Sequence, residues 1–213
     1  ALGNAVKSGA IGEVRYVRYA SRGRFFPYPE GSYYRTAASG GQFVHNGPHA
    51  VDLVCALLNE TPEEVCATAQ SHYPTEDRLE TENYWLAQYR FPSGALATVE
   101  MNLLMLDPPG YPPQIEVEVI GTKGILSIGV DARPTIELFG KGGMRYLSIE
   151  RRDRADDPFV LLMQEFAQAI LAGKPAPIPM DFSMAVNEAC LKAVSSARRN
   201  RPERIEGGWR WTA

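Results

Sequence analysis

The chain has 213 residues and a formal net charge of −3, with 22 Lys and Arg against 25 Asp and Glu. This length is enough to bury a core without disulfides, and the balanced charge excludes a strongly basic nucleic-acid-binding protein and a highly acidic disordered one. No apolar run reaches the ~18 residues that a membrane helix needs, so we expect neither nucleic acid nor a membrane as a partner.

Cysteine usage points to a reducing compartment. Cys55, Cys66 and Cys190 are odd in number, form no CxxC pair and have apolar neighbours. This pattern is typical of buried, reduced thiols. We therefore expect a cytoplasmic protein.

The first residues resemble the last turns of a helix. Leu2 and Val6 are spaced i, i+4, and Gly9 stands where a glycine commonly ends a helix. A chain that opens in this way predicts a fragment of a longer protein. The alternating residues 13–21 then predict a strand, and residues 22–39, which lack a period, predict a long irregular loop.

A helix is predicted over residues 48–58. Pro48 suits its first position, and Asn46 can cap it. The predicted buried stripe consists of Val51, Val54, Leu57 and Leu58. This placement leaves His45 outside the helix and puts His49 in its first turn.

A series of strands follows without intervening helices, which favours a mostly antiparallel sheet. The predicted strands are residues 64–70, 83–91, 95–105, 115–121, 125–130, 135–139 and 145–150.

Two helices are expected at the end of the chain. The first begins with Asp157 as cap and Pro158, and it ends at Gly173; the second covers residues 181–199. The predicted core face of the first is Phe159, Met163, Phe166 and Ile170. The fold class is therefore α+β, one domain over residues 1–213 with a mostly antiparallel, open-faced β-sheet and helices packed on one face.

His45 and His49 are the main candidates for a chemical role, and three interpretations of them stay open. A metal site needs at least three protein ligands, and no third is identified. His49 could instead simply pack at a helix start. A catalytic role is the third possibility, because a neutral imidazole can take a proton at physiological pH and Asp52, at i+3, could orient the ring.

Motifs for nucleotide binding are missing from the chain. It contains neither GxGxxG nor GxxxxGK[ST]. The nucleophile elbow GxSxG of hydrolases is also absent. A self-contained nucleotide-dependent enzyme is therefore not predicted.

Five segments in order resemble the C-terminal domain of the Gfo/Idh/MocA oxidoreductases. They are "SGAIGEVRYVR", "YYR…SGG", "HNGPHAVDL", "VEVIGTKGIL" and "EFAQAILAGKPAPI". The resemblance covers essentially all of the chain. It implies an NAD(P)-dependent dehydrogenase of a sugar, an inositol or a related polyol, whose N-terminal Rossmann domain and Glu-Lys-Pro lysine are absent from this chain.

The resemblance also assigns roles to single residues. Family members commonly have a glycine-rich turn, then Asp-x-Gly-x-His, then an Asp three residues after the His. Gly40 and Gly41 match the turn, and His45 replaces the first Asp. The resemblance implies that His49 is catalytic through proton transfer, that Gly47 and Asp52 support it, and that His45, Asn46, Tyr34 and Arg35 bind substrate.

These roles imply a mechanism for the longer protein. A substrate hydroxyl would give its proton to His49 while hydride leaves for NAD or NADP, which the missing domain would mainly bind. This chain alone would then be inactive. The resemblance also implies a homo-oligomer through the open sheet face. The alternative is a non-catalytic sugar-binding or oligomerisation module of the same fold, with His45 marking a decayed site.

Overall fold

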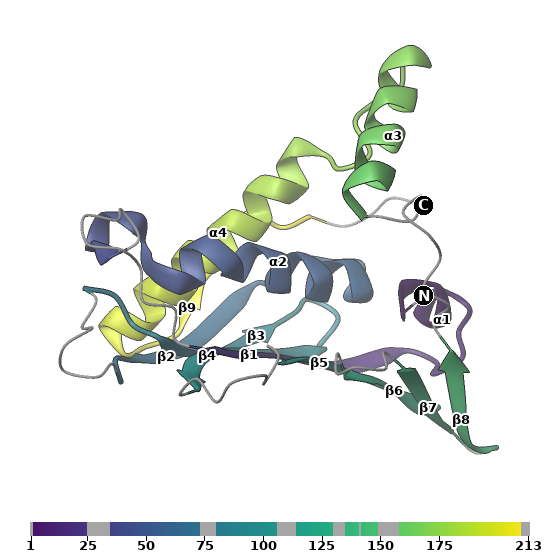
Figure 1. Ribbon diagram of the computed structural model, residues 1–213, viewed down its shortest axis with the longest axis horizontal. Helices are drawn as coiled ribbons and strands as arrows, with labels where there is room; N and C mark the ends of the chain where they lie inside the picture. The colour runs from purple at the N-terminus through teal and green to yellow at the C-terminus, as the bar shows by residue number, and fades with distance from the viewer. Residues whose placement is uncertain are drawn as a thin grey trace.

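A nine-stranded open β-sheet with helices on one side forms the body of the chain (Figure 1). The structure is a computed structural model and describes residues 2–24, 35–72, 80–105, 114–129, 135–140, 142–148 and 158–209. The strands are β1 (Val14–Arg24), β2 (Glu64–Gln70), β3 (Tyr84–Arg90), β4 (Leu96–Met105), β5 (Gln114–Gly121), β6 (Gly124–Gly129), β7 (Thr135–Gly140), β8 (Gly143–Ser148) and β9 (Glu203–Arg204). The predicted α+β class is confirmed.

The sheet is mostly antiparallel, as predicted. Its strand order is β8-β7-β6-β5-β1-β4-β3-β2-β9. The exception is β1, which pairs with β4 in parallel and with β5 antiparallel. A parallel pair is possible here because β1 and β4 are not consecutive: a helix and the two strands β2 and β3 lie between them in the chain, which gives the long connection that parallel strands need.

The predicted strand boundaries agree closely with the observed ones, with one larger difference. β1 continues to Arg24 rather than ending at residue 21, because Arg22 and Arg24 still pair with Asn102 and Met105 of β4. The predicted loop is therefore wrong for its first three residues. Residues 25–34 lie outside the described part of the chain.

Helices α2 (Gly41–Leu58) and α4 (Met180–Arg199) cover one face of the sheet (Figure 1). The alternation of each strand buries every second side chain against them. In β3, for example, Trp85, Ala87 and Tyr89 are buried, and the Trp85 ring lies 5.1 Å from the ring of Phe43 in α2. This core fixes α2 on the sheet.

The opposite sheet face is polar and half-exposed. Arg22 bridges Glu116 of β5 at 3.1 Å and Glu100 of β4 at 3.5 Å, while Arg18 contacts Glu116 at 3.3 Å. Cys66 of β2 also points to this side and is exposed. The predicted burial of this thiol is wrong, because the alternation of β2 places Cys66 opposite the buried Val65 and Ala67. Cys55 and Cys190 are buried, as expected.

The two remaining helices lie close to their predicted positions in the chain. Helix α1 (Leu2–Lys7) confirms the predicted helical start and is followed by Gly9, whose φ is +73°. Helix α3 (Pro158–Leu171) has nearly the predicted bounds, although its proposed cap, Asp157, lies outside the described residues. None of the helices in the described ranges is long and apolar enough to cross a membrane.

The predicted core face of α3 is wrong for the described chain. Met163 is 63% exposed, Phe166 46% and Ile170 64%, and Phe159 is also exposed. The physical reason is that α3 stands apart from the sheet and from α2, so the core has no surface that meets this face (Figure 1).

Candidate functional site

The candidate site is the N-terminal half of α2, and a pair of glycines sets where that helix begins. Gly40 and Gly41 have φ values of +74° and +78°, in the region that glycine tolerates best. The short 3-10 helix η2 (Ala37–Ser39) precedes them, and the hydroxyl of Ser39 accepts the N–H of Gly41 at 3.1 Å. The helix therefore starts well before the position that the sequence predicted.

This early start corrects the prediction that Pro48 begins the helix and that Asn46 caps it. Gly40 holds the cap position, and Pro48 lies inside the helix. Proline removes one backbone donor, here the bond to the carbonyl of Val44. The buried side chain of Phe43 holds the preceding turns on the core, so the helix continues through Pro48.

Both histidines consequently lie on one helix. His45 and His49 are four residues apart and share its exposed side, whereas Phe43, Gly47 and Ala50 face the core. The prediction that His45 lies outside the helix is therefore wrong. Asp52 follows one turn later and is also exposed, so the three polar side chains form an exposed row along α2, which we call the histidine row.

Gly47 lies on the core side of α2. A Cβ atom at this position would lie 3.2 Å from Cδ1 of the Phe43 ring, which is tighter than ordinary contact. A larger residue would force the Phe43 ring of the same helix to shift and would so disturb its packing on Trp85 of the sheet. Gly47 therefore faces the core and not the histidine row, and its predicted support of His49 stays a prediction.

The electrostatics link the last two members of the row. Although Asp52 as a residue is exposed, the surrounding protein partly desolvates its carboxyl group and raises its pKa above the ordinary value of 3.8, and the charge of His49 opposes that rise. No hydrogen bond or ion pair between His49 and Asp52 occurs in the described structure. The two groups interact through space, and the predicted orienting contact stays a prediction.

The loop before α2 is fastened to the segment before β3. The backbone N–H of Ala37 donates to Oε2 of Glu80 at 2.7 Å, and the carbonyl of Arg35 accepts the N–H of Glu80 at 3.1 Å. Arg35 thus leads directly into the turn that begins α2. Sequence reasoning missed Glu80, because its partners are distant in the chain and no local pattern marks it. Tyr34 lies outside the described residues.

Metal ligation finds no support among the described side chains. They contain no group of three His, Cys, Asp or Glu residues that could hold a metal ion. His72 lies elsewhere, with its ring nitrogen 2.7 Å from Oε1 of Gln70. The described residues therefore supply no third metal ligand beside His45 and His49.

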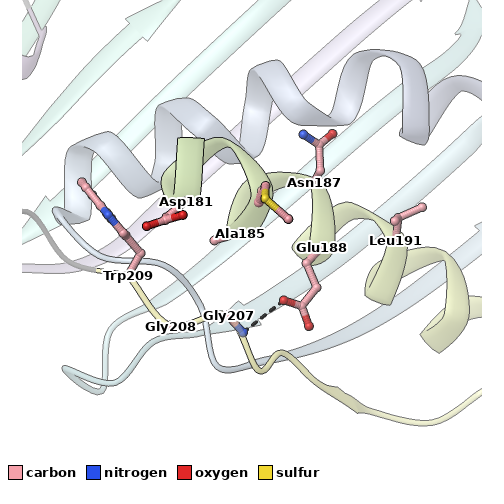
Figure 2. A pocket seen from close by; sticks show the side chains of 9 residues that line it. Asp181, Ala185, Asn187, Glu188, Leu191, Gly207, Gly208 and Trp209 are labelled. Atoms are coloured by element: carbon pink, nitrogen blue, oxygen red, sulfur yellow. Dashed lines mark hydrogen bonds between the residues drawn. The ribbon is translucent and has the colours of Figure 1, made fainter. Parts of the chain in front are cut away.

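A separate hollow of about 700 Å³ lies between α4 and the chain after β9 (Figure 2). The carboxylate of Glu188 accepts the backbone N–H groups of Glu206 and Gly207 at 3.1 and 3.0 Å. Met184 and Leu191 supply its apolar wall, and Trp209 closes one end. Because the Glu188 carboxylate already accepts these two backbone N–H groups, it is not available to a ligand in the hollow. No pattern in the sequence predicted the hollow.

Comparison with known proteins identifies the fold. A putative oxidoreductase from Thermotoga maritima superposes with a TM-score of 0.81 at 20% identity, over 96% of this chain and 59% of that one. Levoglucosan dehydrogenase in complex with NADH gives 0.81 at 17% identity, over 96% and 62%. An oxidoreductase from Agrobacterium radiobacter in complex with NAD+, L-tartaric acid and magnesium gives 0.77 at 17% identity, over 96% and 60%.

These relatives are longer proteins, of which this chain spans less than two thirds. A search of curated protein sequences found no match. The model of one family, described as the GFO/IDH/MocA C-terminal domain, matches residues 1–127, more than half of the chain. The chain belongs to the GFO/IDH/MocA oxidoreductase family and carries the fold of its C-terminal domain.

Proposed function

We propose that this chain is the substrate-binding and oligomerisation domain of an NAD(P)-dependent dehydrogenase that oxidises a sugar, an inositol or a related polyol. The observation that carries the proposal is the histidine row on the exposed side of α2. Support for the substrate class comes from relatives of the same fold that are complexed with levoglucosan and NADH or with L-tartaric acid and NAD+. Each of these ligands carries hydroxyl groups.

The proposed chemistry assigns one task to each polar group. His49 takes the proton of the substrate hydroxyl, because a neutral imidazole can act as a general base near neutral pH. Asp52 stabilises the imidazolium that results, since a carboxylate one turn away attracts a positive charge. When bound, the nicotinamide cofactor accepts the hydride.

The remaining predicted residues hold the substrate. His45 lies one turn before His49 and can donate to or accept from a second hydroxyl. Asn46 is half-buried beside it, and Arg35 lies in the loop that Glu80 fastens. We extend the same role to Tyr34, on the resemblance alone.

We place the main dinucleotide site outside residues 1–213. A glycine-rich phosphate-binding turn is absent from the sequence. This chain alone should therefore lack dehydrogenase activity. Calorimetric titration of the chain with NAD+ and with NADP+ should show no tight binding. Micromolar affinity for either dinucleotide would contradict the placement of the main dinucleotide site outside residues 1–213.

We further propose that the open sheet face joins two or more copies of the protein. That face holds half-exposed ion pairs between Arg22, Glu100 and Glu116, which a partner could cover while leaving their charges paired. Sedimentation equilibrium should detect a dimer or a larger oligomer, whereas a monomer at high concentration would contradict the proposal. The free, partly buried thiols favour a cytoplasmic location.

A substrate survey tests the proposed activity. The longer protein that carries this chain would be incubated with a panel of sugars, inositols and sugar acids, with NAD+ or NADP+, and reduction followed at 340 nm. Turnover of at least one hydroxylated substrate is expected. Binding of sugars without any reduction of either dinucleotide would favour the non-catalytic module instead.

A further inference from the structure

The hollow between α4 and the chain after β9 is a ligand-sized pocket that the proposed function does not use (Figure 2). Its volume of about 700 Å³ lies within the range of roughly 300–1,000 Å³ that small-molecule pockets have. Met184, Leu191 and Trp209 form apolar parts of its wall, and Asp181 and Asn187 add polar groups. Its described lining contains no residue of α2, so the hollow is separate from the histidine row.

The wall that follows β9 is held in place by the rest of the fold. The backbone N–H of Trp209 donates to the hydroxyl of Thr61 at 2.7 Å, and the Trp209 carbonyl accepts the N–H of Thr61 at 3.0 Å. The Trp209 ring packs on the ring of Phe182 in α4, with the centroids 4.8 Å apart. The carboxylate of Glu188 holds the preceding turn through two backbone N–H groups. The hollow is therefore formed before a ligand enters it, which lowers the cost of binding.

The charges of the described lining favour a positively charged ligand. Its charged side chains are Asp181 and Glu188, and both are acidic. Glu188 is occupied by the backbone, whereas Asp181 is exposed and makes no hydrogen bond or ion pair with another described residue. Asp181 also lies in the first turn of α4, where its charge offsets the positive end of the helix. An anion in the hollow would therefore meet like charge, and a cation would meet an available carboxylate.

Asp181 and Trp209 lie at the same end of the hollow. Phe182 follows Asp181 in α4 and packs on the Trp209 ring, and Figure 2 shows the Asp181 side chain beside Trp209. A cation at this end can pair with the carboxylate and lie against the indole ring, whose face attracts positive charge. Met184 and Leu191 lie further along α4 and are 63% and 58% exposed. An apolar group that extends from the cation would remove them from water.

We propose that the hollow binds a small organic cation, an amine or guanidinium compound with an apolar ring or chain. Its charged group lies between Asp181 and Trp209, and its apolar part covers Met184 and Leu191. The ligand is a small molecule because the site is a hollow of ligand size rather than a broad, flat surface. Binding at this site does not depend on the proposed dehydrogenase activity.

Three compounds that share a benzyl group test the required charge: benzylammonium, benzyl alcohol and phenylacetate. Each would be titrated by calorimetry into the longer protein that carries this chain, without dinucleotide and at neutral pH. Benzylammonium should bind saturably and at least about fivefold more tightly than benzyl alcohol, because an exposed ion pair and a cation–π contact each add a factor of a few. Phenylacetate should bind more weakly than both. Absence of saturable benzylammonium binding, or equal binding of phenylacetate, would overturn the proposal.

Variants on α4 locate the binding site. Asp181→Asn should weaken benzylammonium at least about fivefold and leave benzyl alcohol unchanged, whereas Glu118→Gln, on the opposite sheet face, should change neither. Met184→Lys places a cation of the chain in the hollow and should abolish benzylammonium binding. Met184→Gln has a side chain of similar length without the charge and should retain it. Unchanged binding by Asp181→Asn, or equal losses for the two Met184 variants, would overturn the proposal. Thermal unfolding checks that each variant is folded.

Two further results would assign the hollow to a different occupant. Arg210 follows Trp209 in the sequence, so tighter benzylammonium binding by Arg210→Ala than by the parent would show that a cation of the chain itself competes for the site. Tighter binding of the capped dipeptide acetyl-Leu-Arg-amide than of benzylammonium, lost in Asp181→Asn, would assign the hollow to a segment of another protein. Either result would overturn the proposal of a small-molecule ligand.

Discussion

A Cβ atom on Gly41 would lie 2.9 Å from the Cβ of Thr81, so the first turn of α2 rests directly on the segment that leads into β3. Thr81 is buried, and the neighbouring Glu80 fastens the loop before the helix through Ala37. The position of the histidine row on the sheet thus depends on how closely these two segments approach.

Gly41→Ala should destabilise the fold by about 2–4 kcal/mol. The new side chain meets Thr81 at a distance that requires a shift, and it also adopts the left-handed conformation, which costs about 1–2 kcal/mol for other residues. Gly94→Ala is the matched control, because Gly94 also has a positive φ but has open space where the Cβ would lie. Urea denaturation should show the larger loss for Gly41→Ala; equal losses would contradict a contact with Thr81.

Asp52 should make the stability depend on pH. Its pKa is raised in the folded chain by burial, so the folded state binds more protons than the unfolded state between the two pKa values. The stabilisation is present below the unfolded pKa, near 3.9, and is lost as pH rises through the folded value.

Asp52→Asn removes that dependence. Unfolding free energies measured from about pH 3 to pH 7 should show the variant gaining stability relative to the parent chain as pH rises. The gain is small, because Asp52 keeps contact with solvent. A relative stability that is constant over this range, or that falls as pH rises, would contradict the raised pKa.

The three thiols should differ in reactivity. Burial raises the pKa of Cys190 to about 12, and burial also raises the pKa of Cys55. Both therefore stay protonated and enclosed at pH 8, where the thiolate is the reactive form. Cys66 is exposed on β2. Titration with Ellman's reagent should give one rapid equivalent in the folded chain and three in denaturant; three rapid equivalents in the folded chain would contradict the burial of Cys55 and Cys190.

Much of the sheet could be predicted because its signals are local. Alternating strands joined by glycine turns lie next to each other in the chain, and the observed β3–β4 and β5–β6 pairs are of this kind. The parallel pairing of β1 with β4 could not be read in the same way, since it joins segments that are far apart in the sequence.

The predicted start of α2 was wrong because two local sequence signals competed. Pro48 resembles a first helical residue, yet the glycine pair at 40–41 and the buried Phe43 determine where the helix begins. The prediction found both histidines but separated them, and the structure brings them onto one side of α2. Helix α3 shows a different kind of error. Its apolar residues recur with the period of a core helix, but the described chain contains no surface that buries them.

The most direct test of the central claim is the turnover of His49→Ala in the longer protein, with the best substrate from the survey. His72→Ala is the control, because His72 is also exposed but follows β2, with its ring 2.7 Å from Oε1 of Gln70, and is not part of the histidine row. Loss of the general base should lower kcat by about 100-fold or more, while His72→Ala should retain parental activity. Parental turnover by His49→Ala with every good substrate would contradict the assignment of His49 as the group that takes the proton.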